Sequence, residues 1–258
     1  MGILNITPDS FYKESRVISV NTALKRADKM IREGADILDI GGESSRPGSN
    51  PVSEEEELKR ILPVINGLIK KFDIPVSVDT YKSAVARAVL EEGVSIINDI
   101  SGLRFNPNMA KTIASAKAAV IIMHISGKPK TMQKNPSYKS LMREITAYLK
   151  RGIKQAVSSG IKESSIIVDP GIGFGKKFSH NITILKKLKQ LQKLKKPILL
   201  GLSRKSFIGK ILDLPVEERL EGSIAASVFG ILNGAQILRT HDVKETKRAL
   251  AVADAIIH

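Results

Sequence analysis

The feature of this sequence that most limits its fold is a regular alternation of short apolar runs with longer amphipathic segments. The runs are rich in valine and isoleucine without strict polar alternation, which is typical of parallel strands buried on both faces. The predicted strands are 2–6, 36–41, 75–80, 95–101, 119–124, 165–170, 198–203 and 237–242. The predicted helices are 21–33, 53–71, 81–92, 108–116, 139–158, 179–195, 218–232 and 243–257.

Eight strand–helix units in 258 residues predict an α/β fold of the (β/α)8 TIM barrel type. A doubly wound parallel sheet is the alternative, but it usually has fewer units and a glycine-rich turn early in the chain. No linker or low-complexity segment divides the sequence, so we expect a single domain over residues 1–258. Ser53, followed by acidic residues at 54–57, predicts a helix N-cap.

Composition excludes several classes of function. The chain has no cysteine, which excludes disulfides and thiolate metal sites. No apolar stretch reaches the length of about 18 residues that a membrane span needs. The N-terminal sequence has no basic leader or cleavage-like site, so we expect a cytoplasmic protein without membrane contact.

The net charge of +15 raises the question of nucleic-acid binding. Much of the excess charge lies in helical stretches such as 186–196, where leucines at 185, 188, 191 and 194 predict an amphipathic helix with a solvated lysine face. The chain has no tryptophan, four tyrosines and seven phenylalanines, and no aromatic residues alternate with the basic ones. We therefore expect no nucleic-acid partner.

Functional side chains follow the predicted strands, at the end where a barrel has its mouth. The residues at these ends are Asn5, Glu43, Asp79, Asn98, Asp99, Met123, His124, Asp169, Ser203, Arg204, Lys205, Arg239 and His241. Turn-forming residues alone would account for one or two of them. A mixture of acids, amides and bases around the ring instead predicts a polar pocket with distinct subsites.

The first predicted subsite combines Asp79, Asn98 and Asp169 with Lys205 nearby. Two carboxylates and an amide suit a flat, nitrogen-rich ring, because adjacent N–H groups can pair with a carboxylate. A metal site built on the two aspartates is the rival interpretation, and it lacks a third ligand at suitable spacing.

The second predicted subsite binds an anion. Arg239 and His241 follow the last strand, and the segment 203–210 follows the strand before it and enters a short helix. Barrels commonly bind phosphate at these two loops. The loops 5–11 and 41–49 are polar and rich in proline and glycine, as expected of lids. Within the first, Asn5 and Asp9 offer oxygen ligands for a Mg²⁺ that accompanies a polyphosphate.

The segment VDPGIGFGK, residues 168–176, places glycine at three alternate positions after Asp169. Its spacing matches neither a Walker loop nor a dinucleotide fingerprint. We expect these glycines to let the backbone pass close to a ligand that Asp169 holds.

Seven motifs, from residue 2 to about 243, resemble those of the dihydropteroate synthase family in order and spacing. They are GILNITPDSF, DIGGESSRPGS, SVDTYK, IINDISG, DPGIGFGK, SRKSFIG and RTHDV. The resemblance implies a pterin-binding (β/α)8 barrel and a transferase of folate biosynthesis. The substrates would be 6-hydroxymethyl-7,8-dihydropterin diphosphate and p-aminobenzoate, and the products 7,8-dihydropteroate and pyrophosphate. Sulfonamides would compete with p-aminobenzoate.

The resemblance also implies roles for individual residues. The pterin would be held by Asp79, Asn98, Met123, Asp169 and Lys205. The diphosphate would be bound by Asn5, Arg46, Arg239 and His241, with Asn5 beside the Mg²⁺ cofactor. The p-aminobenzoate site would comprise Phe11, Ser45, Arg46, Pro47, Phe174 and Ser206. The catalytic group would comprise Asp79, Lys205, Arg239 and His241.

The expected chemistry needs no covalent nucleophile. Cleavage of the C–O bond at the pterin methylene leaves a cation that the electron-rich ring delocalises, so we expect a dissociative displacement. Closed loops would orient the weakly nucleophilic aniline and exclude water.

The chain departs from the family pattern at several places. Ser45 stands where the family generally has threonine, the first loop reads Tyr-Lys-Glu-Ser after Phe11, and the loop after the fifth strand reads His-Ile-Ser-Gly. The chain also starts at its first strand, without the segment that normally covers the barrel bottom, so it could be part of a longer or bifunctional folate enzyme.

Two alternatives remain open at this level. A pterin-binding methyltransferase domain presents methyltetrahydrofolate to a corrinoid protein from a similar barrel, but it has no pyrophosphate to stabilise. A non-catalytic pterin-binding paralogue is the other. The family is usually dimeric, and 218–232 and 243–257 could supply a homodimer interface or simply pack on the barrel.

Overall fold

The computed structural model describes residues 1–7 and 19–257. Its strands run parallel to their neighbours, and each bound lies within three residues of the predicted one. They are β1 (Gly2–Asn5), β2 (Leu38–Gly41), β3 (Val76–Asp79), β4 (Ile96–Asp99), β5 (Ala119–Met123), β6 (Ile166–Asp169), β7 (Leu199–Gly201) and β8 (Ile237–Arg239).

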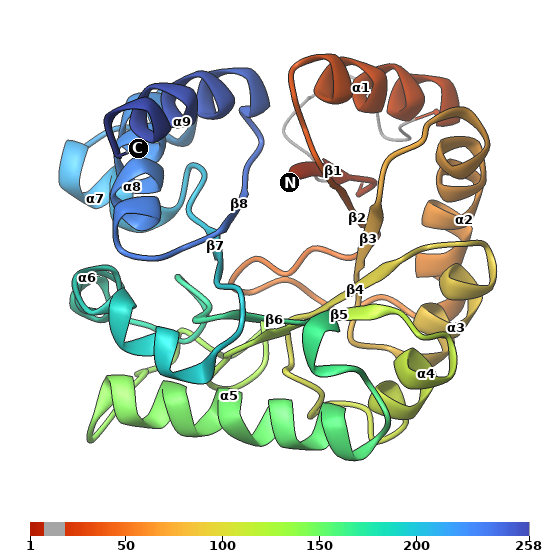
Figure 1. Ribbon diagram of the computed structural model, residues 1–258, viewed down its shortest axis with the longest axis horizontal. Coiled ribbons are helices and arrows are strands. Elements are labelled where there is room, and N and C mark those ends of the chain that lie inside the picture. Colours follow the sequence, from red (N-terminus) through yellow and green to blue (C-terminus); the bar gives the residue numbers. More distant parts are fainter. Residues whose placement is uncertain (8–18, 258) are drawn as a thin grey trace.

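Backbone pairing closes these strands into a ring. Strands β1 to β6 form one sheet in sequence order, and β7 pairs with β8. Two bridges join the pieces: Gly2 pairs with Thr240 just beyond β8, and Val168 of β6 pairs with Ile198 just before β7. The helices form an outer layer around the strands (Figure 1). The predicted (β/α)8 TIM barrel is confirmed.

The helices also follow the prediction closely. They are α1 (Val20–Arg32), α2 (Glu54–Lys71), α3 (Ser83–Glu91), α4 (Met109–Ser115), α5 (Leu141–Ser158), α6 (Phe178–Lys186), α7 (Ser206–Leu212), α8 (Leu220–Leu232) and α9 (Val243–Ile257). Short 3₁₀ helices are η1 (Glu163–Ser165), η2 (Leu188–Leu194) and η3 (Val216–Glu218). The predicted cap at Ser53 is confirmed, because its hydroxyl accepts a hydrogen bond from the Glu56 backbone N–H at 3.1 Å.

One helix prediction was wrong in part. The segment 179–195 was expected to be a single α-helix, but α6 ends at Lys186 and η2 follows as a 3₁₀ helix. The buried leucines 188, 191 and 194 are spaced by three residues, which aligns them on one face of a helix with three residues per turn. The lysines between them face solvent, as predicted.

The core has two parts. Most buried aliphatic side chains lie between the barrel and its helices. A smaller cluster of Met1, Ile96, Ile121 and Leu199 fills the inside of the barrel. Because side chains alternate along a strand, the inward residue two positions after Ile96 is Asn98, and polar groups therefore line the barrel above this apolar floor. None of the helices within residues 1–7 and 19–257 has the length and apolar character that crossing a membrane requires.

Candidate active site

Strand-end side chains from much of the chain meet at one mouth of the barrel. Asp79 of β3 lies in register with Asn98 of β4, and Met123 of β5 lies in register with Asp169 of β6. Arg239 ends β8 and contacts Asp79, which is 160 residues away in the sequence. The structure therefore brings together residues that the sequence assigned to one pocket.

Asp169 and Lys205 form a charged wall of this mouth. The buried Asp169 carboxylate accepts a hydrogen bond from the Gly171 backbone N–H at 2.6 Å. Burial raises the pKa of Asp169, and the Lys205 ammonium opposes this rise. Burial likewise lowers the pKa of Lys205 to about 8, against the attraction of Asp169. The Lys205 ammonium also donates to the Ile172 carbonyl and lies 5.0 Å from the centroid of the Phe174 ring.

Arg239 lies inside the barrel between two carboxylates. Its Nε donates to Asp39 at 2.6 Å and its Nη2 donates to Asp79 at 3.0 Å. The Asn98 amide also donates to Asp39, at 3.4 Å. Burial raises the pKa of Asp79 to about 7, and Arg239 counters part of that rise while Asp39 adds to it. The floor of the mouth is thus a network of two acids, one amide and one guanidinium.

Asp39 is a site residue that the sequence reading missed. It is fully buried in the middle of β2, two residues before the strand end. Asp39 does not stand at a strand end, but inward positions recur at every second residue of a strand, so it too faces the inside of the barrel. A charged residue inside an otherwise apolar strand was the signal that could have identified it.

Two of the three glycines of VDPGIGFGK have a packing role that the sequence did not predict. Gly171 has a φ of +67°, and a Cβ there would lie 1.9 Å from the His124 carbonyl oxygen. Gly175 has a φ of +62°, and its Cβ would lie 2.4 Å from the Ser126 carbonyl oxygen. These two glycines let the loop after β6 pass close to the loop after β5. Gly173 alone faces the mouth, with Lys205 side-chain atoms beginning 3.5 Å from its Cβ position.

Lys176 and His124 form a buried pair behind the mouth. The Lys176 ammonium lies 2.9 Å from His124 Nδ1 and donates to the Phe174 carbonyl at 2.9 Å. Burial and Lys176 lower the pKa of His124 to about 2, so the ring is neutral and Nδ1 accepts the hydrogen bond. His124 therefore does not line the mouth, although its sequence position suggested it. Lys176 also went unrecognised, since nothing local distinguishes it from the surface lysines.

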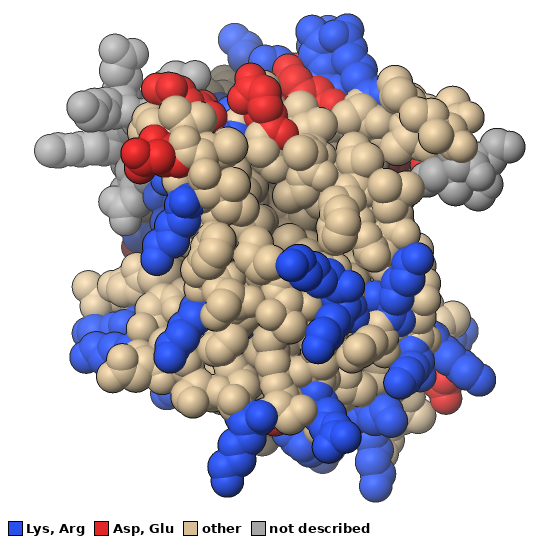
Figure 2. Space-filling model, turned by 90° about the vertical axis from the view of Figure 1, so that its left-hand side faces the viewer, with Lys and Arg blue, Asp and Glu red and all other residues tan. Residues whose placement is uncertain are grey.

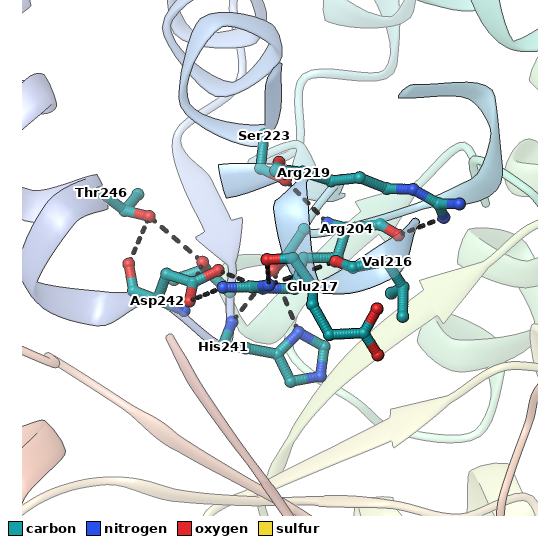
Figure 3. A network of polar contacts seen from close by, with 10 residues as sticks. Arg204, Val216, Glu217, Arg219, Ser223, His241, Asp242 and Thr246 are labelled. Carbon is teal, nitrogen blue, oxygen red and sulfur yellow. Dashed lines mark hydrogen bonds and ion pairs between the residues drawn. The ribbon is translucent and has the colours of Figure 1, made fainter. Parts of the chain in front are cut away.

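Two other strand-end residues, Asp99 and Arg204, make their contacts with loops of the protein. Both carboxylate oxygens of Asp99 accept backbone hydrogen bonds, from Ser101 at 2.7 Å and from Leu103 at 3.0 Å. Arg204 turns away from the mouth, with its guanidinium directed at Asp242 (Figure 3). Both side chains hold loops in place, so neither is a binding group.

Figure 3 shows how completely Arg204 is engaged. It pairs with both Asp242 oxygens at 2.8 and 2.9 Å. It also donates to the carbonyls of Val216 and Glu217, and its own N–H donates to Ser223 at 2.8 Å. Arg204, which follows the seventh predicted strand, therefore does not take part in the anion subsite and instead joins the loop after β7 to the loop after β8.

His241 faces the anion side of the mouth. Its Nδ1 lies 3.0 Å from the Ser203 hydroxyl, which also accepts the His241 backbone N–H at 3.3 Å. Desolvation of the ring by the surrounding protein lowers the pKa of His241 to about 4, and the positive charge of Arg239 adds to this effect. The positive charge of Arg46, in the loop after β2, also lowers the pKa of His241, so this charge lies near the His241 ring. Three cationic or potentially cationic side chains thus gather on this side.

The remaining predicted residues lie in loops around the mouth. Ser45 lines a small cavity together with Asp79, Tyr81 and Ile100. Arg46, Pro47 and Ser206 are exposed. The predictions for Phe11 and Asp9 lie outside the described residues.

Within residues 1–7 and 19–257, no three His, Cys, Asp or Glu side chains are grouped so that they could hold a metal ion. Asn5 Oδ1 lies at the rim, 3.3 Å from the Cβ position of Gly41. A single amide oxygen fits a Mg²⁺ that takes most of its ligands from substrate phosphates and water.

The mouth therefore offers a floor of buried hydrogen-bonding groups with cations along one rim and exposed loops above. Buried carboxylates and an amide at fixed spacing recognise a planar heterocycle by its N–H edge. The cationic rim can stabilise negative charge that develops on a leaving group.

Known proteins share this architecture. The sequence profile of the family described as pterin binding enzyme matches residues 1–241. The dihydropteroate synthase of Clostridium beijerinckii is 46% identical over 258 residues, which cover 100% of this chain and 93% of that protein.

Two solved structures are similar over their length. Yersinia pestis dihydropteroate synthase in complex with a sulfonamide drug has a TM-score of 0.95 and 42% identity, covering 100% of this chain and 93% of that one. The Clostridium difficile enzyme, crystallised in the presence of pteroic acid, has a TM-score of 0.93 and 46% identity, covering 99% and 95%.

Proposed function

The chain belongs to the dihydropteroate synthases of the pterin-binding enzyme family, and we propose how its own residues divide the work of that reaction. These transferases act in folate biosynthesis and join 6-hydroxymethyl-7,8-dihydropterin diphosphate to p-aminobenzoate. The observation that carries the assignment is the convergence of Asp79, Asn98 and Asp169 with Lys205 at one barrel mouth.

Asp169 is proposed to pair with the amino-pyrimidinone edge of the pterin. Its Oδ1 is occupied by the Gly171 N–H, which fixes the carboxylate and leaves its second oxygen for a ring N–H. The Asn98 amide can both donate and accept a hydrogen bond. The Asp79 carboxyl group beside the ring accepts hydrogen bonds when it is ionised and can donate one when it is protonated. Lys205 balances Asp169 and covers the pterin from the β7 side, and Met123 lines the apolar part of the pocket.

The diphosphate is proposed to lie toward His241 and Arg46, with Arg239 below it. Arg239 keeps its charge, because the carboxylates of Asp39 and Asp79 raise its pKa. Binding of an anion would favour the protonated form of His241, which is neutral in the free site. Asn5 would hold the Mg²⁺ together with the substrate phosphates, and the ion would neutralise charge on the departing pyrophosphate.

p-Aminobenzoate is proposed to bind above the pterin, between the loops after β2, β6 and β7. Ser45, Arg46 and Pro47 belong to the first of these loops, and Phe174 and Ser206 to the other two. The Yersinia pestis enzyme binds a sulfonamide drug and the Xanthomonas albilineans enzyme binds 4-aminobenzoic acid, which supports a p-aminobenzoate site in this chain. Phe11, which lies outside the described residues, is also proposed to belong to this site.

In the proposed mechanism, the C–O bond at the pterin methylene breaks before the new C–N bond is complete. The positive charge spreads into the pterin ring, where the carboxylates of Asp79 and Asp169 lie close. Arg239 and His241 stabilise the leaving pyrophosphate. The aniline nitrogen of p-aminobenzoate attacks the methylene and then gives up a proton to the released pyrophosphate. The loops exclude the water that would otherwise react.

The deciding assay measures pyrophosphate released from the pterin diphosphate. Release should require both p-aminobenzoate and Mg²⁺, and 7,8-dihydropteroate should form in equal amount. A methyltransferase domain would release no pyrophosphate, and a non-catalytic paralogue would bind the pterin without turnover. Either outcome would contradict the proposal.

We also propose that the protein is a homodimer. Leu232 of α8 and Val252 and Ile256 of α9 are 50%, 62% and 80% exposed, although they are large and apolar. Figure 2 shows the molecule from the side on which α8 lies, with uncharged surface between acidic groups above and lysine and arginine below. Exposed apolar area of this kind commonly marks a protein interface. Sedimentation of wild type and Val252→Glu should show a dimer and a monomer respectively.

The cytoplasm is the proposed location. A diphosphate ester does not cross membranes unaided, so the enzyme is expected where its substrate is made.

A further inference from the structure

A buried ion-pair cluster lies beside the mouth, outside the groups assigned to either substrate. The Lys82 ammonium lies 2.5 Å from Glu43 Oε2 and 2.5 Å from Glu57 Oε2. Lys82 directly precedes α3, Glu57 lies in the first turn of α2, and Glu43 lies in the loop between β2 and α2. The cluster thus joins three separate parts of the chain.

Glu43 closes the base of this loop, which we call loop 2 and define as residues 42–53. Its Oε2 accepts the Val52 backbone N–H at 3.0 Å, so the two ends of the loop are held together. Its Oε1 accepts the Tyr81 hydroxyl at 2.6 Å. Both oxygens are therefore engaged by the protein, so Glu43 supports the loop while it also lines the small cavity that contains Ser45 and Asp79.

The far part of loop 2 reaches across the mouth. The Gly48 backbone N–H donates to the Pro129 carbonyl in the loop after β5 at 3.1 Å. Between this contact and the Glu43 closure lie Ser45 and Arg46, and Ser45 shares a cavity with Asp79. The position of Ser45 and Arg46 thus depends on where the base of loop 2 is held.

We infer that Lys82 is a positioning residue that, through Glu43, holds loop 2 in the arrangement that receives p-aminobenzoate. This inference rests on the proposed function, which places p-aminobenzoate under loop 2. Burying one ammonium with two carboxylates costs desolvation that an apolar cluster would avoid, so the cluster contributes defined geometry more than stability. Lys82 itself touches neither substrate in this assignment.

The sharpest variant is Glu43→Gln. Lys82 keeps Glu57 as its partner, so no buried charge loses its counter-ion and the fold is preserved. Glutamine has one acceptor oxygen instead of two and no charge, so it loses the ion pair with Lys82 and cannot accept from both Val52 and Tyr81 through separate oxygens. The base of the loop is therefore held less firmly. Glu55→Gln is the matched control, because Glu55 is exposed on the first turn of α2.

We expect Glu43→Gln to raise the KM for p-aminobenzoate about tenfold, and to raise the inhibition constant of a sulfonamide in parallel. The affinity for the pterin diphosphate, measured by calorimetry without p-aminobenzoate, should stay within about twofold. Lys82→Met should produce the same pattern more strongly, and Lys82→Arg should restore part of the p-aminobenzoate affinity.

Three results would overturn the inference. The KM for p-aminobenzoate could be unchanged in folded Glu43→Gln, both substrates could be weakened equally, or Glu55→Gln could match Glu43→Gln. Failure of the proposed function has a different signature, since the wild-type enzyme would then form no dihydropteroate. If Lys82→Met does not fold, Glu43→Gln still decides the question.

Discussion

The loop after β6, residues 170–177, and loop 2 border the same mouth but are held by different means. The β6 loop is pinned through its backbone: Gln133 and Tyr138 donate to the carbonyls of Gly173 and Gly175 at 2.6 and 2.7 Å. Its neighbours leave no room for a side chain at Gly171. Loop 2 is held mainly by side-chain charges at its base, and a Cβ at Gly48 near its tip would meet nothing within 4 Å.

This difference indicates that the two loops have different functions. The β6 loop and the strand ends form a preorganised platform, as expected for the site that selects a rigid bicyclic ring. Loop 2 is set by a few contacts that can be changed without disturbing the barrel. We therefore expect platform variants to affect pterin binding and stability, and loop 2 variants to affect mainly the second substrate.

The largest effect should come from Asp169→Asn on the platform. Asparagine can still accept the Gly171 N–H, so the loop should keep its shape while the charge opposite Lys205 and the ring is lost. Turnover should fall about a thousandfold, because a buried charge-assisted pair to the substrate is removed. Steady-state kinetics and pterin calorimetry measure the loss. Asp254→Asn on the exposed face of α9 is the control, and near-normal turnover of Asp169→Asn would refute its role.

The second prediction compares one glycine from each loop. Gly171→Ala should lower the free energy of unfolding by about 3 kcal/mol, because the methyl group overlaps the His124 carbonyl at an already unfavourable φ. Gly48→Ala also has a positive φ, of +84°, but no clash, so about 1 kcal/mol is expected. Chemical denaturation gives both values. Equal losses would mean that the two loops are equally constrained.

The third prediction concerns pH and the buried acid of the platform. Folded Asp79 keeps its proton up to a pKa of about 7, whereas the unfolded carboxyl loses it near 4. Its contribution to stability is therefore present below the unfolded pKa and is lost as pH rises through the folded pKa. Between pH 5 and 8 the free protein should lose roughly 2 kcal/mol through this group.

Asp79→Asn isolates that contribution. The pKa of Asp99 is also raised by burial, to about 6, but Asp99 is present in both proteins and its effect cancels in the difference. Denaturation curves at several pH values should show a shallower decline for Asp79→Asn than for wild type. Parallel curves would show that Asp79 ionises normally in the folded mouth.

The smallest effect should come from Ser45→Thr in loop 2. The added methyl group enters the cavity that Ser45 shares with Tyr81 and Ile100. One buried methyl group is worth about 0.8 kcal/mol, so sulfonamide inhibition should strengthen about three- to fourfold. Pterin affinity should not change. A change in pterin affinity instead would show that loop 2 and the platform are not independent.

The order of strands and helices could be predicted because its causes are local. Apolar periodicity, β-branched runs and the cap at Ser53 act within a few residues, and each was found where expected. The three-residue spacing of leucines 188, 191 and 194 was visible too, but it was assigned to an α-helix, because choosing between two helix types depends on packing.

The sequence by itself determined the barrel and the residues that end its strands, since parallel strands must direct their carboxyl ends to one mouth. Only the tertiary structure decided which charges meet. Arg239 pairs with Asp39 across 200 positions, Lys82 joins Glu43 and Glu57, and Lys176 finds a neutral His124. Such pairings arise when the barrel closes and desolvates its groups, and no local pattern in the chain records them.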